Sequence, residues 1–199
     1  MLWIAVYKRS CDQREYTLSR AQMPGSAAVR GWKICDRQRL KRWSNMKLGT
    51  VLSIQIAPAG NDPLQNLEQV RAVEGQGLEG DRYYNRTGTY SNKHDESREA
   101  TFIESEALAA LADDYHIALT GAESRRNFTT RGVALNHLVG RQFKAGEAVF
   151  RGIRLCEPCT HLEEASGKPA RKGLIHRGGL RAQIVKSGLV CVGDVVQEA

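Results

Sequence analysis

The sequence predicts a mainly β domain with a few helices, and three observations support this. From Met46 onward, short runs of alternating apolar residues are separated by turns that contain glycine or proline. Only one stretch, beginning near Ser105, keeps a helical period over several turns. The 199 residues suffice for one ordinary domain with a buried core and are too few for two large ones.

The charge is concentrated at the N-terminus. Residues 1–45 contain ten Lys and Arg against three acidic residues, and the rest of the chain holds nineteen of each sign. A basic arm can indicate nucleic-acid binding, but the rest of the chain gives that reading no support. As a targeting segment, the initial apolar run is too short for a secretory signal and no cleavage site follows. We interpret residues 1–45 as an extension outside the domain, with a start at Met46, and residues 46–199 as the domain.

The cysteines and the hydropathy indicate a compartment. The chain has five cysteines, an odd number, and no secretion signal, which predicts a reducing, cytoplasmic environment. No run of eighteen apolar residues occurs, so we expect no membrane-spanning segment.

The first part of the domain reads as strands and loops. Strands are expected over 47–57 and 68–74, separated by the proline-containing segment 58–63. The glycine-punctuated segment 75–84 favours a tight β connection over a phosphate site, because no helix signal follows its G-x-G-x-x-G spacing. Residues 86–98 read as a surface loop, in which His94 is more typical of a solvated side chain than of a ligand.

A helix and a charged turn follow. After a strand over 100–104, Ser105 is the expected N-cap of a helix whose apolar stripe includes Leu108 and Leu111. Arg125, Arg126 and Asn127 then stand at the mouth of the next strand. If this strand end lines a pocket, the planar guanidinium donors suit an oxyanion. A solvated charged turn is an alternative of equal weight.

The remaining chain reads as short strands. Hairpins are expected between 143 and 155, and a final hairpin pairs the strand from Leu180 with the one from Leu189 to Val196. A short turn or helix is expected over 132–140. Cys191 lies in the last apolar run and is expected to be a small buried hydrophobe.

The Cys156-x-x-Cys159 segment allows three readings. Structural zinc needs four ligands, and no second C-x-x-C or closely spaced histidine pair is present. A thioredoxin-like dithiol would open a helix, which the Pro158 and Thr160-His161 context does not predict. The third reading is one thiolate presented on a loop near arginine and histidine.

Five motifs occur in an order that resembles the MOSC domain, the family named after the C-terminal part of molybdenum cofactor sulfurase. The resemblance covers about residues 47–196 and leaves the first 45 outside. The motifs are Gly77-Leu78-Glu79-Gly80-Asp81-Arg82, Arg125-Arg126-Asn127, Gly132 through Gly140, Cys156-Glu157-Pro158-Cys159 and Gly178-Gly179-Leu180-Arg181-Ala182.

The resemblance implies a fold, a cofactor and a set of site residues. The fold would be a closed β-barrel of the pyruvate-kinase β-barrel-like type with a few helices. The cofactor would be the molybdenum cofactor (molybdopterin), with Cys159 as the catalytic residue and the protein ligand to the metal. The residues facing the pterin and its phosphate would be Arg82, Arg125, Arg126 and Asn127, together with His94 or Arg177.

The resemblance also implies an activity. The expected function is reduction of N-hydroxylated or related small substrates, and the alternative is a non-catalytic sulfur or metal-sulfur carrier, with Cys156 as a relay or a structural thiol. The chain has no ferredoxin-type cysteine run, so electrons or sulfur would come from a separate donor protein. It also has no desulfurase domain, so pyridoxal phosphate is not expected to bind this domain itself.

Overall fold

The computed structural model describes residues 49–199, and the expected extension over 1–45 and the start at Met46 lie outside them. Within the described residues, the mainly β prediction is confirmed. The strands are β1 (Gly49–Ile56), β2 (Gln65–Leu67), β3 (Gln69–Val73), β4 (Gly77–Leu78), β5 (Ala100–Glu104), β6 (Phe128–Arg131), β7 (Gln142–Ala145), β8 (Ala148–Leu155), β9 (Leu180–Lys186), β10 (Gly188–Cys191) and β11 (Val195–Glu198). The helices are α2 (Ser105–Tyr115) and α3 (Thr160–Ser166), with short 3-10 turns η1 (Glu96–Arg98), η2 (Leu135–Leu138) and η3 (Lys172–Leu174).

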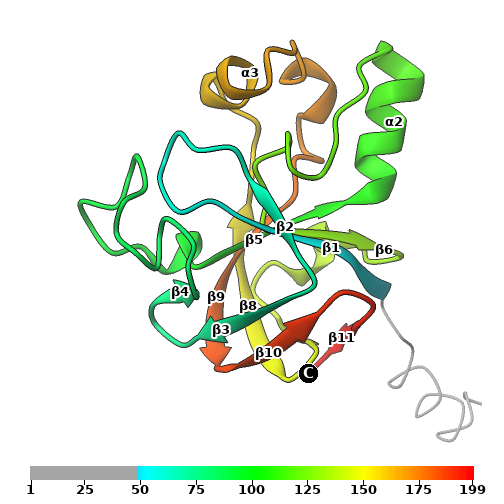
Figure 1. The fold of residues 1–199 in the computed structure, drawn as a ribbon. Helices are drawn as coiled ribbons and strands as arrows, with labels where there is room; N and C mark the ends of the chain where they lie inside the picture. The colour runs from blue at the N-terminus through cyan, green and yellow to red at the C-terminus, as the bar shows by residue number, and fades with distance from the viewer. Residues whose placement is uncertain (1–48) are drawn as a thin grey trace, which may run out of the picture. The chain divides into compact units, whose positions relative to one another are not determined.

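Seven strands close into a barrel (Figure 1), as the resemblance implied. Their order is β11-β7-β8-β9-β5-β6-β1, and the ring is completed where Gly49 and Thr50 of β1 pair with Val196 and Val195 of β11. The β5–β6 pair is parallel, and the other pairs of the ring are antiparallel. Strand β2 extends the sheet beside the second half of β1.

The centre of the barrel is aromatic. All four phenylalanines of the chain are fully buried there, one from each of β5, β6, β7 and β8. Phe102 stacks on Phe128 with ring centroids 4.7 Å apart and meets Phe143 and Phe150 edge-on at 5.2 and 5.1 Å. These offset and edge-to-face contacts add to the stability from burial alone.

Two further layers pack on the barrel. The three-stranded sheet β10-β3-β4 contributes Val70, Ala72, Leu78 and Val190 to the barrel core. A separate small core lies at the other end in Figure 1, where α2 and α3 stand. It is formed by Leu111, Leu119, Leu162, Ala170 and Leu174. None of the helices in residues 49–199 is long and apolar enough to cross a membrane.

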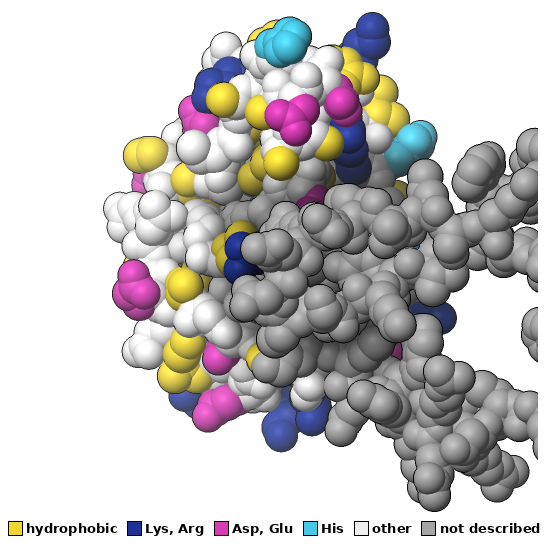
Figure 2. All heavy atoms as spheres, turned by 90° about the vertical axis from the view of Figure 1, so that its right-hand side faces the viewer, with side chains coloured by type: hydrophobic (Ala, Val, Ile, Leu, Met, Phe, Trp, Pro, Cys, Tyr) yellow, Lys and Arg dark blue, Asp and Glu magenta, His cyan; other side chains and the backbone are white. Residues whose placement is uncertain are grey.

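The side chains on the described surface are mixed in sign. Residues 49–199 hold eighteen Lys and Arg against nineteen Asp and Glu. On the face drawn in Figure 2, basic, acidic and hydrophobic side chains are interspersed. Attraction to a polyanion would therefore have to come from local clusters of charge within this part of the chain.

Four local expectations are wrong. The N-cap of α2 is Glu104 and its side chain makes no capping hydrogen bond, so Ser105 is the first helical residue. A helix, α3, does follow Cys159 directly. Strands β9 and β10 form no hairpin, because β9 pairs with β8 and β5 while β10 pairs with β3. Cys191 is half-buried, with its Sγ 3.9 Å from Gln69 Oε1.

Candidate functional site

The three chemically distinctive segments of the sequence meet at one guanidinium. Arg126 is buried, and its Nε donates to the Gly178 carbonyl at 2.9 Å. Its terminal nitrogens donate to the carbonyls of Ser124, at 2.9 Å, and Cys156, at 3.0 Å. Arg126 therefore joins the Arg-Arg-Asn turn, the C-x-x-C loop and the Gly-Gly turn.

Two adjacent glycines allow that close approach. A Cβ on Gly178 would lie 2.5 Å from the Cys156 carbonyl oxygen and 3.0 Å from Pro158 Cδ. A Cβ on Gly179, whose φ is +106°, would overlap the carbonyl oxygen of Phe102. Because only glycine meets both constraints, this pair fixes the turn against the C-x-x-C loop and the barrel wall.

The two cysteines face different environments. Cys156 ends the run from β8, is 1% exposed, and donates its backbone N–H to the Gly179 carbonyl at 2.7 Å. Cys159 is exposed and caps α3, with its carbonyl accepting from Leu162 N–H at 3.0 Å. Between them, the Glu157 carboxylate accepts from the backbone N–H of His176 at 3.0 Å. Of these two cysteines, Cys159 is the one that presents its thiol to a ligand or a partner.

Arg125 points away from Arg126 because its backbone is left-handed, with φ +62°. Such a φ is uncommon for a non-glycine residue and turns the two consecutive side chains in different directions. The Arg125 guanidinium donates to the Gly60 and Asp62 carbonyls at 2.5 and 2.7 Å. It also lines a pocket of about 280 Å³ together with His161.

His161 is a site candidate that sequence reasoning did not select. It stands on the first turn of α3, two residues after Cys159, and shares its pocket with Arg125, Asn61, Glu164 and Ala165. The available signal was its place beside the C-x-x-C. That signal was weak because the helix that orients His161 was not expected.

Arg82 adds a second positive charge near Arg125. It is buried, with Nη1 3.2 Å from Asp81 Oδ1 and its guanidinium carbon 5.1 Å from the centre of the Tyr83 ring. Burial lowers the pKa of Arg125, and the charge of Arg82 lowers it further. An anion bound between the two guanidiniums would relieve that repulsion.

The Asn127 side chain makes its hydrogen bonds within the protein. Its Oδ1 accepts from the Thr101 hydroxyl at 2.7 Å and from the Thr101 N–H at 3.1 Å. Its Nδ2 donates to the Gln55 carbonyl and to Asp81 Oδ1 at 3.1 and 3.3 Å. Both amide hydrogens are thus used within the protein, and contact between this side chain and a cofactor stays a prediction.

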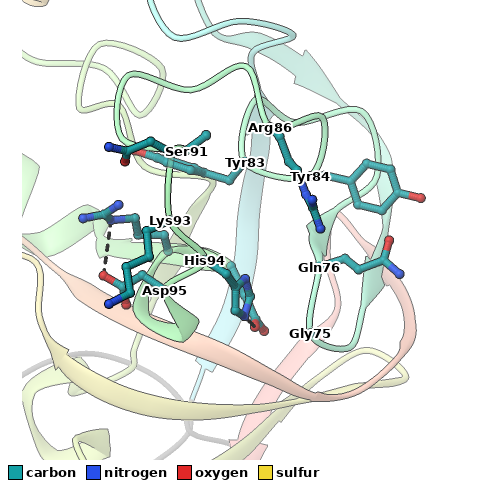
Figure 3. Close-up of a pocket in the computed structure, with 12 residues that line it drawn as sticks. Gly75, Gln76, Tyr83, Tyr84, Arg86, Ser91, Lys93, His94 and Asp95 are labelled. Atoms are coloured by element: carbon teal, nitrogen blue, oxygen red, sulfur yellow. Dashed lines mark ion pairs between the residues drawn. The ribbon is translucent and has the colours of Figure 1, made fainter.

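His94 and Arg177 are oriented elsewhere. Arg177 belongs to the Gly-Gly turn, but it donates to the Gly173 carbonyl at 2.6 Å and pairs with Asp114 of α2 at 3.1 Å. His94 lines a pocket of about 360 Å³ that shares no lining residue with the Arg125–His161 pocket (Figure 3). Its Nε2 lies 3.4 Å from Oε1 of the buried Glu99. Their cofactor roles also stay predictions.

Glu99 makes stability depend on pH. Burial raises the pKa of this carboxyl, while the Ile184 N–H, 2.7 Å from Oε2, and the charge of His94 oppose the rise. In the folded protein Glu99 therefore keeps its proton to a higher pH than in the unfolded chain, where the ordinary pKa is 4.5. The free energy of unfolding is highest below that pH and falls as the pH rises through the raised pKa.

We expect Glu99→Gln to remove this pH dependence. The amide can still accept from Ile184 and carries no charge to bury. The melting temperature of the variant should exceed that of the wild type at pH 8, and the difference should shrink at pH 5. Calorimetry at both pH values measures it, with the exposed Glu68→Gln as a control for charge removal. A difference that grows toward pH 5 would contradict this account.

The described residues contain no group of three or more His, Cys, Asp or Glu side chains placed to hold a metal ion. The exposed Cys159 thiol suits a metal whose other ligands belong to a cofactor, since thiolates are soft ligands.

The family model of the MOSC domain matches residues 89–197 of this sequence. This chain belongs to the MOSC domain family. The match contains β5 to β10 and most of β11, and with them the Arg-Arg-Asn, C-x-x-C and Gly-Gly segments. The family expected from the order of the motifs is confirmed.

Solved structures show the same fold. YuaD of Bacillus subtilis is 14% identical with a TM-score of 0.63, and the alignment covers 74% of this MOSC chain and 93% of YuaD. YiiM of Geobacillus stearothermophilus is 15% identical with a TM-score of 0.54, covering 77% and 74%. YiiM of Escherichia coli is 16% identical with a TM-score of 0.55, covering 75% and 69%. No curated protein matches the sequence. At these identities, the likenesses establish the fold alone.

Proposed function

We propose that this MOSC protein binds the molybdenum cofactor through Cys159 and reduces small N-hydroxylated or related substrates with electrons from a separate donor protein. The observation that carries the proposal is an exposed thiol at the N-cap of α3, two residues before His161, which lines a pocket together with Arg125. A soft thiolate suits molybdenum, and guanidiniums suit phosphate.

The residues present fit the group in two respects. Cys159 has an accessible Sγ and sits at the start of α3, where the Glu157–His176 contact and Arg126 hold its loop. The half-buried Arg125 and the buried Arg82 carry like charges that an anion would stabilise. Cys159 would bind the metal, and these arginines would hold the phosphate. When bound, the cofactor would supply the two-electron redox chemistry.

The other side chains of the site have positioning roles. Arg126 and Asn127 use their donors on the protein itself and would fix the loops that carry Arg125 and Cys159. His161, two residues after Cys159, would face the ligand from α3. A histidine in that place can act as a general acid, which a reduction that consumes protons requires.

The test is the composition of the purified protein. Produced in a host that makes the cofactor, the protein should carry molybdenum and pterin in equal amounts by mass spectrometry and pterin fluorescence. Protein from the same host unable to make the pterin should carry neither. Metal-free protein from the competent host would overturn the proposal.

A sulfur-carrier role is the second candidate, favoured by the exposure of Cys159. Its thiolate could accept a sulfur atom from a donor persulfide, forming a cysteine persulfide and releasing the donor thiol. The buried Cys156 could not take that sulfur without movement of its loop. Persulfide on Cys159 after incubation with a cysteine desulfurase and cysteine, with no molybdenum in the protein, would favour this candidate.

A further inference from the structure

The pocket around His94 has the features of a built ligand site. The turn Gly75–Gln76 faces it from one side, and Tyr83, Arg86, Lys93 and His94 surround it (Figure 3). Its volume of about 360 Å³ lies at the lower end of the range for small-molecule sites, roughly 300–1,000 Å³. A small metabolite fits such a volume.

A buried acid with a free acceptor lines this pocket. The Glu99 side chain is 2% exposed, and its Oε2 accepts from the Ile184 N–H. Its Oε1 has no hydrogen-bond partner in the described part of the chain, because His94 Nε2 lies at 3.4 Å without hydrogen-bond geometry. An unsatisfied buried acceptor costs free energy, which a ligand with N–H donors would recover.

The rim carries the opposite charge. Arg86 and Lys93 are exposed and form no ion pair with any described residue, whereas the neighbouring Arg98 is neutralised by Asp95 at 3.3 Å. Arg86 and Lys93 stand on opposite sides of the pocket (Figure 3), and either free cation suits a phosphate. Tyr83 supplies a half-buried ring, against which a planar heterocycle can stack.

We propose that this pocket binds a guanine mononucleotide, with the N–H and amino donors of the base on Glu99 and the phosphate on Lys93. Guanine presents two adjacent donors on one edge, which match a carboxylate, so its binding would itself favour the ionised form of Glu99. The site is separate from the Arg125–His161 pocket, so the proposal does not depend on the proposed function. Pterin phosphates present the same donor edge, and the second experiment below distinguishes a guanine nucleotide from a pterin phosphate.

The first experiment is a calorimetric titration of the purified full-length protein with GMP and AMP. GMP should bind at least about tenfold more tightly, because AMP places an acceptor against the acceptor oxygens of Glu99. Glu99→Gln, whose folding is checked by its melting curve, should abolish the preference, since its amide directs N–H groups at the base. Equal binding of GMP and AMP, or a preference that persists in Glu99→Gln, would overturn the proposal.

The second experiment tests the phosphate contact at the rim and the alternative that the ligand is a pterin phosphate. Lys93→Ala should weaken GMP about tenfold and leave guanosine unchanged, whereas Lys144→Ala, an exposed lysine on β7, should change neither. GMP should bind equally to molybdenum-free protein and to protein from a cofactor-producing host. Binding of a pterin monophosphate but not GMP would assign the pocket to a pterin and reject the nucleotide.

Discussion

Replacing Arg126 by alanine is expected to lower the free energy of unfolding by roughly 3–6 kcal/mol. Arg126 is 7% exposed, and its guanidinium donates to three backbone carbonyls, on Gly178, Ser124 and Cys156. Alanine would leave these acceptors without the donor and open a cavity between the loops. Urea unfolding of the cofactor-free protein measures the loss without any contribution from binding.

Two matched variants separate the effect of the guanidinium's three hydrogen bonds from the effect of its charge. Arg126→Lys keeps the charge but cannot reach three carbonyls from one ammonium, so it should recover less than half of the loss. Arg141→Ala removes an exposed guanidinium that pairs with Glu198 at 2.8 Å, and should cost less than about 1 kcal/mol. An Arg126→Ala protein as stable as the wild type would show that Arg126 does not join the loops.

Local patterns predicted most strands because strand signals are short-range. The alternating run over 47–57 became β1, and the apolar run over 100–104 became β5. Closure of the barrel was not visible in these patterns, since it joins Gly49 to Val196 across nearly the whole described chain. For the same reason β9 and β10 looked like a hairpin: they are adjacent in sequence, but their hydrogen-bond partners lie on distant strands.

The Arg-Arg-Asn segment shows what a motif alone leaves open. The sequence places Arg125 and Arg126 side by side as equal candidates for an anion. The left-handed backbone at Arg125 turns one side chain toward a pocket and leaves the other buried against carbonyls. Backbone conformation at a non-glycine residue depends on its tertiary contacts, so no local pattern could divide these roles.

The missed helix α3 has a similar cause. Its seven residues are too few for a clear apolar period, and only Leu162 is buried. Pro158 precedes the helix, where it is tolerated, and Cys159 occupies the extended N-cap position with φ −129°. The sequence argument against a thioredoxin-like dithiol, which expected no helix after the C-x-x-C, is therefore wrong on that point. The exposures of 1% for the Cys156 residue and more than a third for Cys159 now distinguish the two thiols.

Replacing Cys159 by alanine is expected to reduce the molybdenum content of protein from a cofactor-producing host at least about tenfold. The thiol is the proposed link between protein and metal, and its side chain is exposed, so the fold should be kept. Molybdenum per chain, measured by mass spectrometry beside a melting curve, separates lost binding from lost folding.

The matched variant Cys156→Ala decides which thiol is the ligand. Its backbone bonds to Gly179 and Arg126 do not involve sulfur and persist in the variant. Deleting the buried Sγ costs packing, so the melting temperature should fall while molybdenum stays within about twofold of the wild type. Each variant is therefore expected to change a different quantity. Cys159→Ala lowers the metal content at constant stability, and Cys156→Ala lowers stability at constant metal content. The reverse pattern would place the ligand at Cys156 and require its loop to open, which would break the contact between Arg126 and the Cys156 carbonyl.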